Sequence, residues 1–347
     1  MRERERGHAR RGHASGEREP RDVGDDSGRA LDAAVSQHGM RQVDGKWSSP
    51  GLSDGSAGGA GARAEVDDDW IMRCTGDLMA RPLTMWSSGL LDALPPCFDH
   101  AVVGAAAGLG RNAWGAALLM RDVSADLVPS GDDPIPLAQH LRFMEHMAAL
   151  HTSFWGWHDD LGLAPLPNRL VEFNPESVSC EERKGWPEPV PKLAIQGWAR
   201  FPEVAGARGA GVLDVVHDVA PLVDALDACP QTFLHGDWKM GNLGSAPDGR
   251  TVVLDWAMPG QGCPTLELAW YLALNRARLP HAKEAAIEAY RTALEDQGVD
   301  TDPWFDRALD LALLTGLVWF GWEKALGGPG PELDWWLDAA QRGLTRL

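Results

Sequence analysis

The pattern of apolar and polar residues predicts a short region of strands followed by a long region of helices. Residues 100–108 and 114–122 are apolar runs on either side of a Gly-Leu-Gly-Arg-Asn turn, which is typical of two paired strands. Over residues 137–157 the apolar positions instead recur every three or four residues, which indicates one long amphipathic helix. A small sheet with a helical majority is an α+β arrangement.

Two other segments lack the helical period, and several more have it. The proline-rich stretch 164–191 lacks it and is predicted to be loop around short turns. Residues 1–65 are rich in Arg, Glu, Asp, Gly and Ser and have few large apolar side chains, so they are predicted to form a tail and flexible linker. Further helices are predicted over about residues 67–77, 81–95, 190–200, 212–228, 264–278, 281–297, 302–326 and 331–346.

A group of polar residues whose spacing resembles that of a catalytic site lies between two of the apolar segments. His235, Asp237 and Asn242 fit the pattern H-x-D-x-x-x-x-N, and Asp255 follows Asn242 by 13 residues across a predicted hairpin. Phosphoryl transfer needs a carboxylate that accepts the proton of the attacking hydroxyl, and an amide and a second carboxylate that hold Mg²⁺ on the nucleotide phosphates. Asp237 suits the first role, and Asn242 and Asp255 suit the second. An ordinary hairpin with a surface Asp and Asn is less favoured, because the polar residues lie where apolar strands begin and end.

At these residues the chain resembles the aminoglycoside phosphotransferase and choline-kinase-like family, over about residues 66–347. The catalytic loop of that family often reads H-G-D-x-x-x-x-N, and its metal motif, an apolar residue followed by Asp and an aromatic residue, is similar to Leu254-Asp255-Trp256. Its next helix opens G-x-P-x-x-D-L-A, where this chain has Glu267 in place of the Asp. Residues 137–155 and 114–124 resemble other family segments more weakly.

The resemblance implies a protein-kinase-like fold with a small sheet lobe and a large helical lobe. It also implies ATP and Mg²⁺ as cofactors and phosphorylation of a small-molecule hydroxyl. Residues 66–123 would be what remains of the nucleotide-binding lobe and hinge, and residues 124–347 the catalytic lobe. Residues 1–65 would precede both as a disordered or aberrant segment.

The resemblance further suggests a binding place for the nucleotide base. The backbone around Leu119, Met120 and Arg121 would hydrogen-bond the adenine edge. Asp122 would cap the segment that follows or lie near the ribose, and capping is the preferred interpretation.

Two loop residues have more than one interpretation. His235 is expected to brace the loop by hydrogen bonds rather than to shuttle protons. Lys239 is a candidate for stabilising charge at the γ-phosphate, as a lysine at a similar place does in protein kinases, and the alternative is a solvated loop lysine.

The small lobe departs from the family at the strand lysine that holds the α- and β-phosphates. Lys46 is the only lysine before the hinge, and its surroundings predict no strand. Three explanations stay open: a degenerate nucleotide lobe, a reading-frame error ahead of residue 67, or another cation, for which Arg63 and Arg73 are weak candidates. A non-catalytic pseudokinase that binds a nucleotide or metabolite is therefore the alternative function.

Charge and composition restrict the partners. Basic and acidic residues balance in residues 1–65, so the net charge of −18 lies in residues 66–347, which argues against nucleic acid. This charge would suit a cationic substrate such as a polyamine sugar, and a merely acidic soluble surface is the favoured alternative. Only seven residues separate Trp256 from Pro264, too few for a peptide platform, so a small-molecule substrate is predicted.

The remaining residues give weaker indications. Five widely spaced cysteines, no secretory signal and no apolar run long enough to span a membrane predict free thiols and a cytoplasmic location. The 16 tryptophans are expected to pack in the core, although Trp319 and Trp322 are candidates for a substrate wall. Glu267 is a possible amine contact, and a surface charge is the favoured interpretation.

Overall fold

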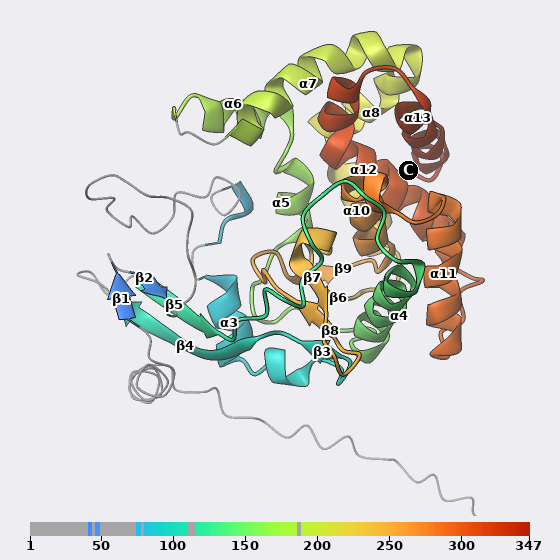
Figure 1. Cartoon of the computed structure of the whole chain (residues 1–347). Coiled ribbons are helices and arrows are strands. Elements are labelled where there is room, and N and C mark those ends of the chain that lie inside the picture. Colours follow the sequence, from blue (N-terminus) through green and yellow to red (C-terminus); the bar gives the residue numbers. More distant parts are fainter. Residues whose placement is uncertain (1–40, 44–45, 49–73, 78–79, 110–114, 186–188) are drawn as a thin grey trace, which may run out of the picture.

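The computed structural model describes residues 41–43, 46–48, 74–77, 80–109, 115–185 and 189–347, and it shows a small lobe beside a larger helical one (Figure 1). The small lobe contains the antiparallel strands β4 (Val102–Leu109) and β5 (Gly115–Met120), with helix α3 (Arg81–Ser87) packed on them. These strands confirm the two apolar runs predicted on either side of the glycine-rich turn.

A second strand pair lies in the segment predicted to be linker. β1 (Arg41–Val43) runs antiparallel to β2 (Lys46–Ser48), and Val43 pairs in register with Lys46. The prediction that Lys46 lies outside any strand is therefore wrong. Strands of three residues are too short to show the alternation from which strands are predicted. The rest of residues 1–65, and residues 67–73 of the helix predicted over residues 67–77, which include Arg73, lie outside the described residues.

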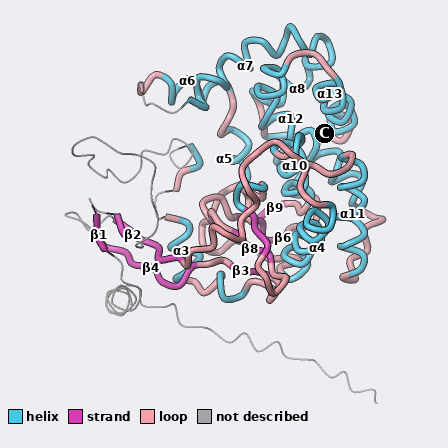
Figure 2. Tube along the Cα trace, viewed as in Figure 1, coloured by secondary structure: helices cyan, strands magenta, loops and turns pink. Residues whose placement is uncertain are grey.

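The large lobe is built around α12 (Phe305–Gly327), which packs against α7 (Pro189–Ala205), α10 (Thr265–Leu274) and α13 (Pro331–Leu344). Most side chains of α12 are buried, as expected for a helix that is apolar on all faces. The tube in Figure 2 shows how fully helices make up this lobe. It also contains the long helices α4 (Leu137–Ser153) and α11 (Lys283–Asp296) and the short helices α8 (Ala210–His217) and α9 (Ala220–Asp227).

Two helices, α5 (Leu166–Val171) and α6 (Pro175–Glu182), occupy the proline-rich stretch predicted to be loop. That prediction is wrong because proline fits the first turn of a helix, where its missing N–H needs no partner. Asn174 caps α6, since its side-chain oxygen accepts the Ser177 N–H at 2.7 Å. The single helix predicted over residues 212–228 is likewise two helices, α8 and α9.

Two small sheets at the junction of the lobes carry the predicted motif. β6 (Thr232–Leu234) pairs antiparallel with β9 (Gly260–Gly262), and β7 (Leu243–Ser245) pairs antiparallel with β8 (Thr251–Val253). β3 (Phe98–Asp99) adds to β8 in parallel and gives the order β3-β8-β7. The predicted hairpin is thus confirmed, and the Asn242 carbonyl oxygen accepts the Leu254 N–H at 2.9 Å at its open end.

The cysteines and the helices agree with two simpler expectations. All five cysteines are free thiols; Cys229 and Cys263 are buried, Cys74 and Cys97 are partly buried and Cys180 is exposed. In the part of the chain that the structure describes, no helix is both long enough and apolar enough to cross a membrane.

Candidate active site

The residues of the predicted motif meet between the two junction sheets. Asp237 lies in the loop from β6 to β7, and Nδ2 of Asn242 donates to its Oδ2 at 2.9 Å and to its carbonyl oxygen at 3.0 Å. Asp255, directly after β8, lines the same cavity as Asp237. Its φ of 62° is a left-handed conformation that is uncommon outside glycine and concentrates at functional sites.

Three side chains hold the Asp237 carboxylate in one orientation. The indole Nε1 of Trp270 donates to Oδ1 at 2.9 Å. Nζ of Lys239 donates at 2.6 Å to Oδ2, the oxygen that also accepts from Asn242. Asp237 is almost buried, whereas Lys239 is partly exposed. Lys239 therefore pairs directly with the predicted base, and its contact with a γ-phosphate stays a prediction.

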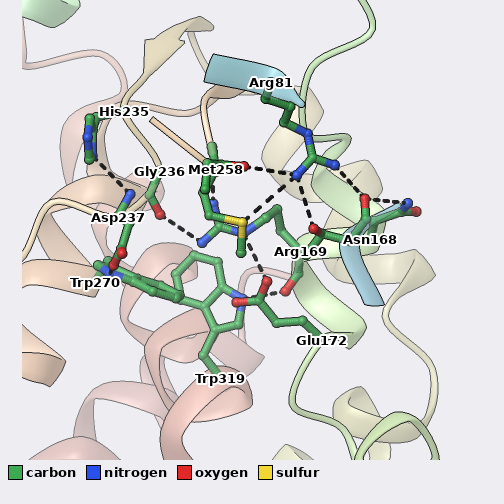
Figure 3. Close-up of polar contacts among 12 residues, drawn as sticks. Arg81, Asn168, Arg169, Glu172, His235, Gly236, Asp237, Met258, Trp270 and Trp319 are labelled. Atoms are coloured by element: carbon green, nitrogen blue, oxygen red, sulfur yellow. Dashed lines mark hydrogen bonds and ion pairs between the residues drawn. The ribbon is translucent and has the colours of Figure 1, made fainter. Parts of the chain in front are cut away.

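His235 joins the loop to the hairpin strand. Its Nε2 lies 2.9 Å from the carbonyl oxygen of Leu254, which can only accept, so Nε2 carries the ring proton. Nδ1 then accepts the Asp237 N–H at 3.2 Å (Figure 3). Both ring nitrogens are bonded to backbone and the side chain is buried. This geometry supports the bracing role over proton transfer.

Glu267, in the first turn of α10, anchors the start of the loop. Its Oε1 accepts the Gly236 N–H at 2.6 Å, and its Oε2 accepts the His235 N–H at 3.1 Å and His151 Nε2 at 3.0 Å. Burial raises the pKa of this carboxyl, but hydrogen bonds from His151 and the backbone and the nearby histidines lower it more, so the pKa falls below its usual value. The expectation of a surface charge is wrong, because Glu267 is buried.

Gly236 is the position in the loop where only glycine fits. Its φ is 83°, and a Cβ there would lie 1.9 Å from the carbonyl oxygen of Met258. The loop can therefore press its backbone against the segment that follows Asp255. This contact brings the two halves of the motif together.

The donor set suits Mg²⁺. Asn242 directs its amide nitrogen at Asp237, which leaves the amide oxygen as its donor to an ion, and Asp255 offers carboxylate oxygens. Among the described residues no group of three or more His, Cys, Asp and Glu side chains is arranged to hold a metal. Mg²⁺ is commonly bound by one or two protein oxygens with phosphate and water as the other ligands, so the pair fits that ion.

The residues predicted to meet the nucleotide base lie at the end of β5. Leu119 is buried, and the Arg121 N–H already donates to the Ala101 carbonyl oxygen at 2.9 Å. Asp122 accepts the N–H and the hydroxyl of Ser124 at 3.0 and 2.7 Å, and these bonds lower the pKa of its carboxyl. The geometry supports capping by Asp122, while an adenine contact at Leu119 and Met120 stays a prediction.

A cavity of about 400 Å³ opens beside Asp237 and Asp255. Trp322, one of the two candidates for a substrate wall, lines it, whereas Trp319 lines a smaller cavity of about 30 Å³ beside Gly236. Both tryptophans are buried, as expected for core residues. The other residues around the larger cavity are mostly apolar or aromatic. They are Phe173, Val190, Lys239, Ala257, Met258, Trp270, Leu274 and Phe320.

Two buried arginines near the site were missed by sequence reasoning. Arg169 of α5 donates to the carbonyl oxygens of Gly236 and Met258 at 2.8 and 3.2 Å. Arg81 of α3 donates to the carbonyl oxygen of Ala257 at 3.0 Å. These contacts join positions far apart in sequence, and no local pattern signals them.

A protein-family model matches the part of the chain that forms this site. Residues 106–301 match the model of the Phosphotransferase enzyme family, a segment that includes the whole loop, Asp255 and Glu267. The chain belongs to this family. Membership confirms the predicted resemblance, the α+β protein-kinase-like fold class and the phosphotransferase class of enzyme.

Several solved structures are similar to the chain at low sequence identity. Choline kinase LicA from Streptococcus pneumoniae is 15% identical with a TM-score of 0.42, over 79% of this chain and 84% of that one. The microcompartment-associated aminopropanol kinase is 14% identical with a TM-score of 0.43, over 82% of each chain. Macrolide 2'-phosphotransferase type I is 20% identical with a TM-score of 0.36, over 77% and 78%. The sequence matched none of the curated proteins.

Glu172 gives the site a testable pH dependence. Burial raises the pKa of its carboxyl to about 7 from the usual 4.5, although the pairing with Arg169 opposes the shift; Asp237 and Arg81 are its other charged neighbours. A raised folded-state pKa means that stability present below pH 4.5 is lost as the pH rises toward 7. Glu172→Gln should abolish this loss, so the free energy of unfolding of the variant should fall less than that of the parent between pH 4.5 and pH 8. The amide leaves the buried Arg169 without a charged partner, so the variant should be less stable than the parent at pH 8.

Urea unfolding of the parent and of Glu172→Gln between pH 4.5 and pH 8 measures this difference. Glu182→Gln is the control, since Glu182 is an exposed carboxyl at the end of the next helix, α6, and this variant should behave like the parent. Equal pH dependence in the parent and Glu172→Gln would contradict the assignment.

Proposed function

We propose that the chain catalyses ATP- and Mg²⁺-dependent transfer of a phosphoryl group to a hydroxyl of a small molecule. One observation carries the proposal. The Asp237 carboxylate lies at a cavity with Asp255, and it is bonded to Asn242. A base for the hydroxyl and oxygen donors for the ion thus stand side by side, which is what in-line phosphoryl transfer requires.

Each residue has a defined part in this reaction. Asp237 orients the acceptor hydroxyl and takes its proton as the oxygen bonds to phosphorus and ADP departs. Asn242 and Asp255 hold Mg²⁺, which neutralises charge on the phosphates when bound. Lys239 lies beside the base and offers positive charge to the transferred group. His235 and Glu267 keep the loop in place.

The acceptor we propose is a compact alcohol with an apolar face. Four aromatic residues line the cavity, and its charged side chains, among the described residues, are Asp237, Lys239 and Asp255. A polyamine sugar needs several carboxylates beyond those that serve the reaction, so the cavity supports an uncharged or singly charged alcohol over a polycation. The acidic charge of the chain is then a property of its surface.

The alternative of a pseudokinase depended on the lack of a small-lobe strand lysine. Lys46 opens strand β2, and the intact Asp237, Asn242 and Asp255 support catalysis further. We therefore favour catalysis over binding alone.

We place the reaction in the cytoplasm, with no nucleic-acid partner. The five free thiols and the excess of acidic residues support this setting.

Asp237→Asn should lower kcat by about 10² to 10⁴, because the amide keeps the shape of the carboxylate but accepts no proton. The KM for ATP should stay within about twofold, since Asp237 is not assigned to the nucleotide. The steady-state rate of ADP release, with an alcohol that the parent phosphorylates, measures both kcat and the KM for ATP. Asp248→Asn makes the same change on the exposed turn of the β7–β8 hairpin, and its kcat should equal that of the parent. Undiminished turnover in Asp237→Asn would refute the assignment of Asp237 as the catalytic base.

Trp322→Ala should raise the KM for the acceptor by about tenfold while the KM for ATP stays constant, because the variant removes apolar wall and leaves the loop untouched. Trp322→Phe should recover most of the affinity, since the indole nitrogen of Trp322 has no hydrogen-bond partner among the described residues. Turnover of a polyamine sugar in preference to compact alcohols, or equal acceptor KM in the parent and Trp322→Ala, would contradict the proposed acceptor.

A further inference from the structure

Arg169 is a buried cation at the point where the two loops of the site touch. Its Nη2 donates to the carbonyl oxygen of Gly236, the residue before Asp237, at 2.8 Å. Its Nη1 donates at 3.2 Å to the carbonyl oxygen of Met258, which lies three residues after Asp255. One planar, rigid group therefore spans the catalytic loop and the metal-binding loop (Figure 3).

The same guanidinium group lies over two indoles whose planes are 82° apart. Its central carbon lies 4.7 Å from the ring centre of Trp270 and 5.8 Å from that of Trp319. Trp270 is the residue whose Nε1 donates to Oδ1 of Asp237. Trp319 in turn donates its Nε1 to the Arg169 carbonyl oxygen at 2.8 Å. Arg169 thus contacts the indole that orients Asp237.

Arg169 pairs with the buried carboxyl group of Glu172. Its Nε donates to Oε2 of Glu172 at 3.1 Å, and both side chains are buried. A buried ion pair with further hydrogen bonds is rigid, and removal of one partner leaves an uncompensated charge. The guanidinium therefore has one position, defined by two carbonyl oxygens, one carboxylate and an aromatic face.

We propose that Arg169 is a positioning residue for phosphoryl transfer: it sets the spacing of the two loops and, through Trp270, the direction of the Asp237 carboxylate. Arg169 contacts neither Asp237 nor Asp255 directly in any of these bonds, so it acts through Gly236, Met258 and Trp270. The proposal rests on the proposed function, since a direction of Asp237 matters only if Asp237 takes a proton.

The proposal predicts a loss of kcat without a loss of binding. Arg169→Lys keeps the charge beside Glu172, but a single ammonium has no flat face for Trp270 and no fork for two carbonyl oxygens. It should lower kcat about tenfold and leave the KM for ATP and for the acceptor within twofold, because a small misplacement of a reacting group is enough to slow the reaction. Trp270→Phe keeps an aromatic face for Arg169 but removes the donor to Asp237, and it should lower kcat by a similar factor.

A double-mutant cycle separates positioning from a merely structural role. If Arg169 acts through Trp270, the double variant should be no slower than about the slower single variant. Arg200→Lys is the matched control, since Arg200 also donates to a carbonyl oxygen, that of Leu326, but at an exposed place, and its kcat should equal that of the parent. Unchanged kcat in Arg169→Lys, or fully additive losses in the double variant, would overturn the proposal. If Arg169→Lys does not fold, an unchanged kcat in Trp270→Phe would overturn it alone.

A second readout works without turnover. The Trp270 indole N–H gives an NMR signal that Trp270→Phe identifies, and its hydrogen exchange reports the bond to Asp237. Exchange should accelerate at least tenfold in Arg169→Lys and not in Arg200→Lys. If the parent phosphorylates no alcohol, the proposed function fails; faster exchange in Arg169→Lys would still support the positioning contact, and unchanged exchange would overturn that as well.

Discussion

One buried carboxylate, that of Glu267, holds the site in place. Its two oxygens accept three hydrogen bonds, from the backbone N–H groups of His235 and Gly236 and from the ring of His151. A carboxylate away from water is costly unless its oxygens are bonded, so α4, α10 and the start of the loop are tied to one another. With the loop fixed there, Gly236 can press on Met258 and Asp237 can face the cavity.

The charged groups behind Asp237 extend the same constraint. Arg169 and Glu172 form a buried pair that touches both loops, and Lys239 and Trp270 hold the two oxygens of Asp237. Each charge has a partner, so the base needs little rearrangement before it acts. The cavity in front of it is largely apolar, which leaves the reacting groups as the main polar features that a substrate meets.

The sequence predicted the parts of this site that depend on local order. The hairpin, the positions of Asn242 and Asp255 and most of the helices follow from periodicity and turn residues that lie close together in the chain. The role of Arg169 was not predicted, because its hydrogen-bond partners are 67 and 89 residues away in the sequence. Its helix also begins at prolines, which suggested a loop. Glu267 was recognised within a motif, but the sequence does not show that its carboxylate is buried and accepts hydrogen bonds from the backbone of the loop.

Calorimetric titration of MgATP into the parent and into Asp255→Ala tests the central claim most directly. We expect the parent to bind MgATP, and Asp255→Ala to lose the Mg²⁺-dependent part of the affinity while both chains melt at similar temperatures. Equal affinity in the two chains, or equal affinity of the parent for ATP with and without Mg²⁺, would contradict the assignment of Asp255 and with it the phosphoryl-transfer site.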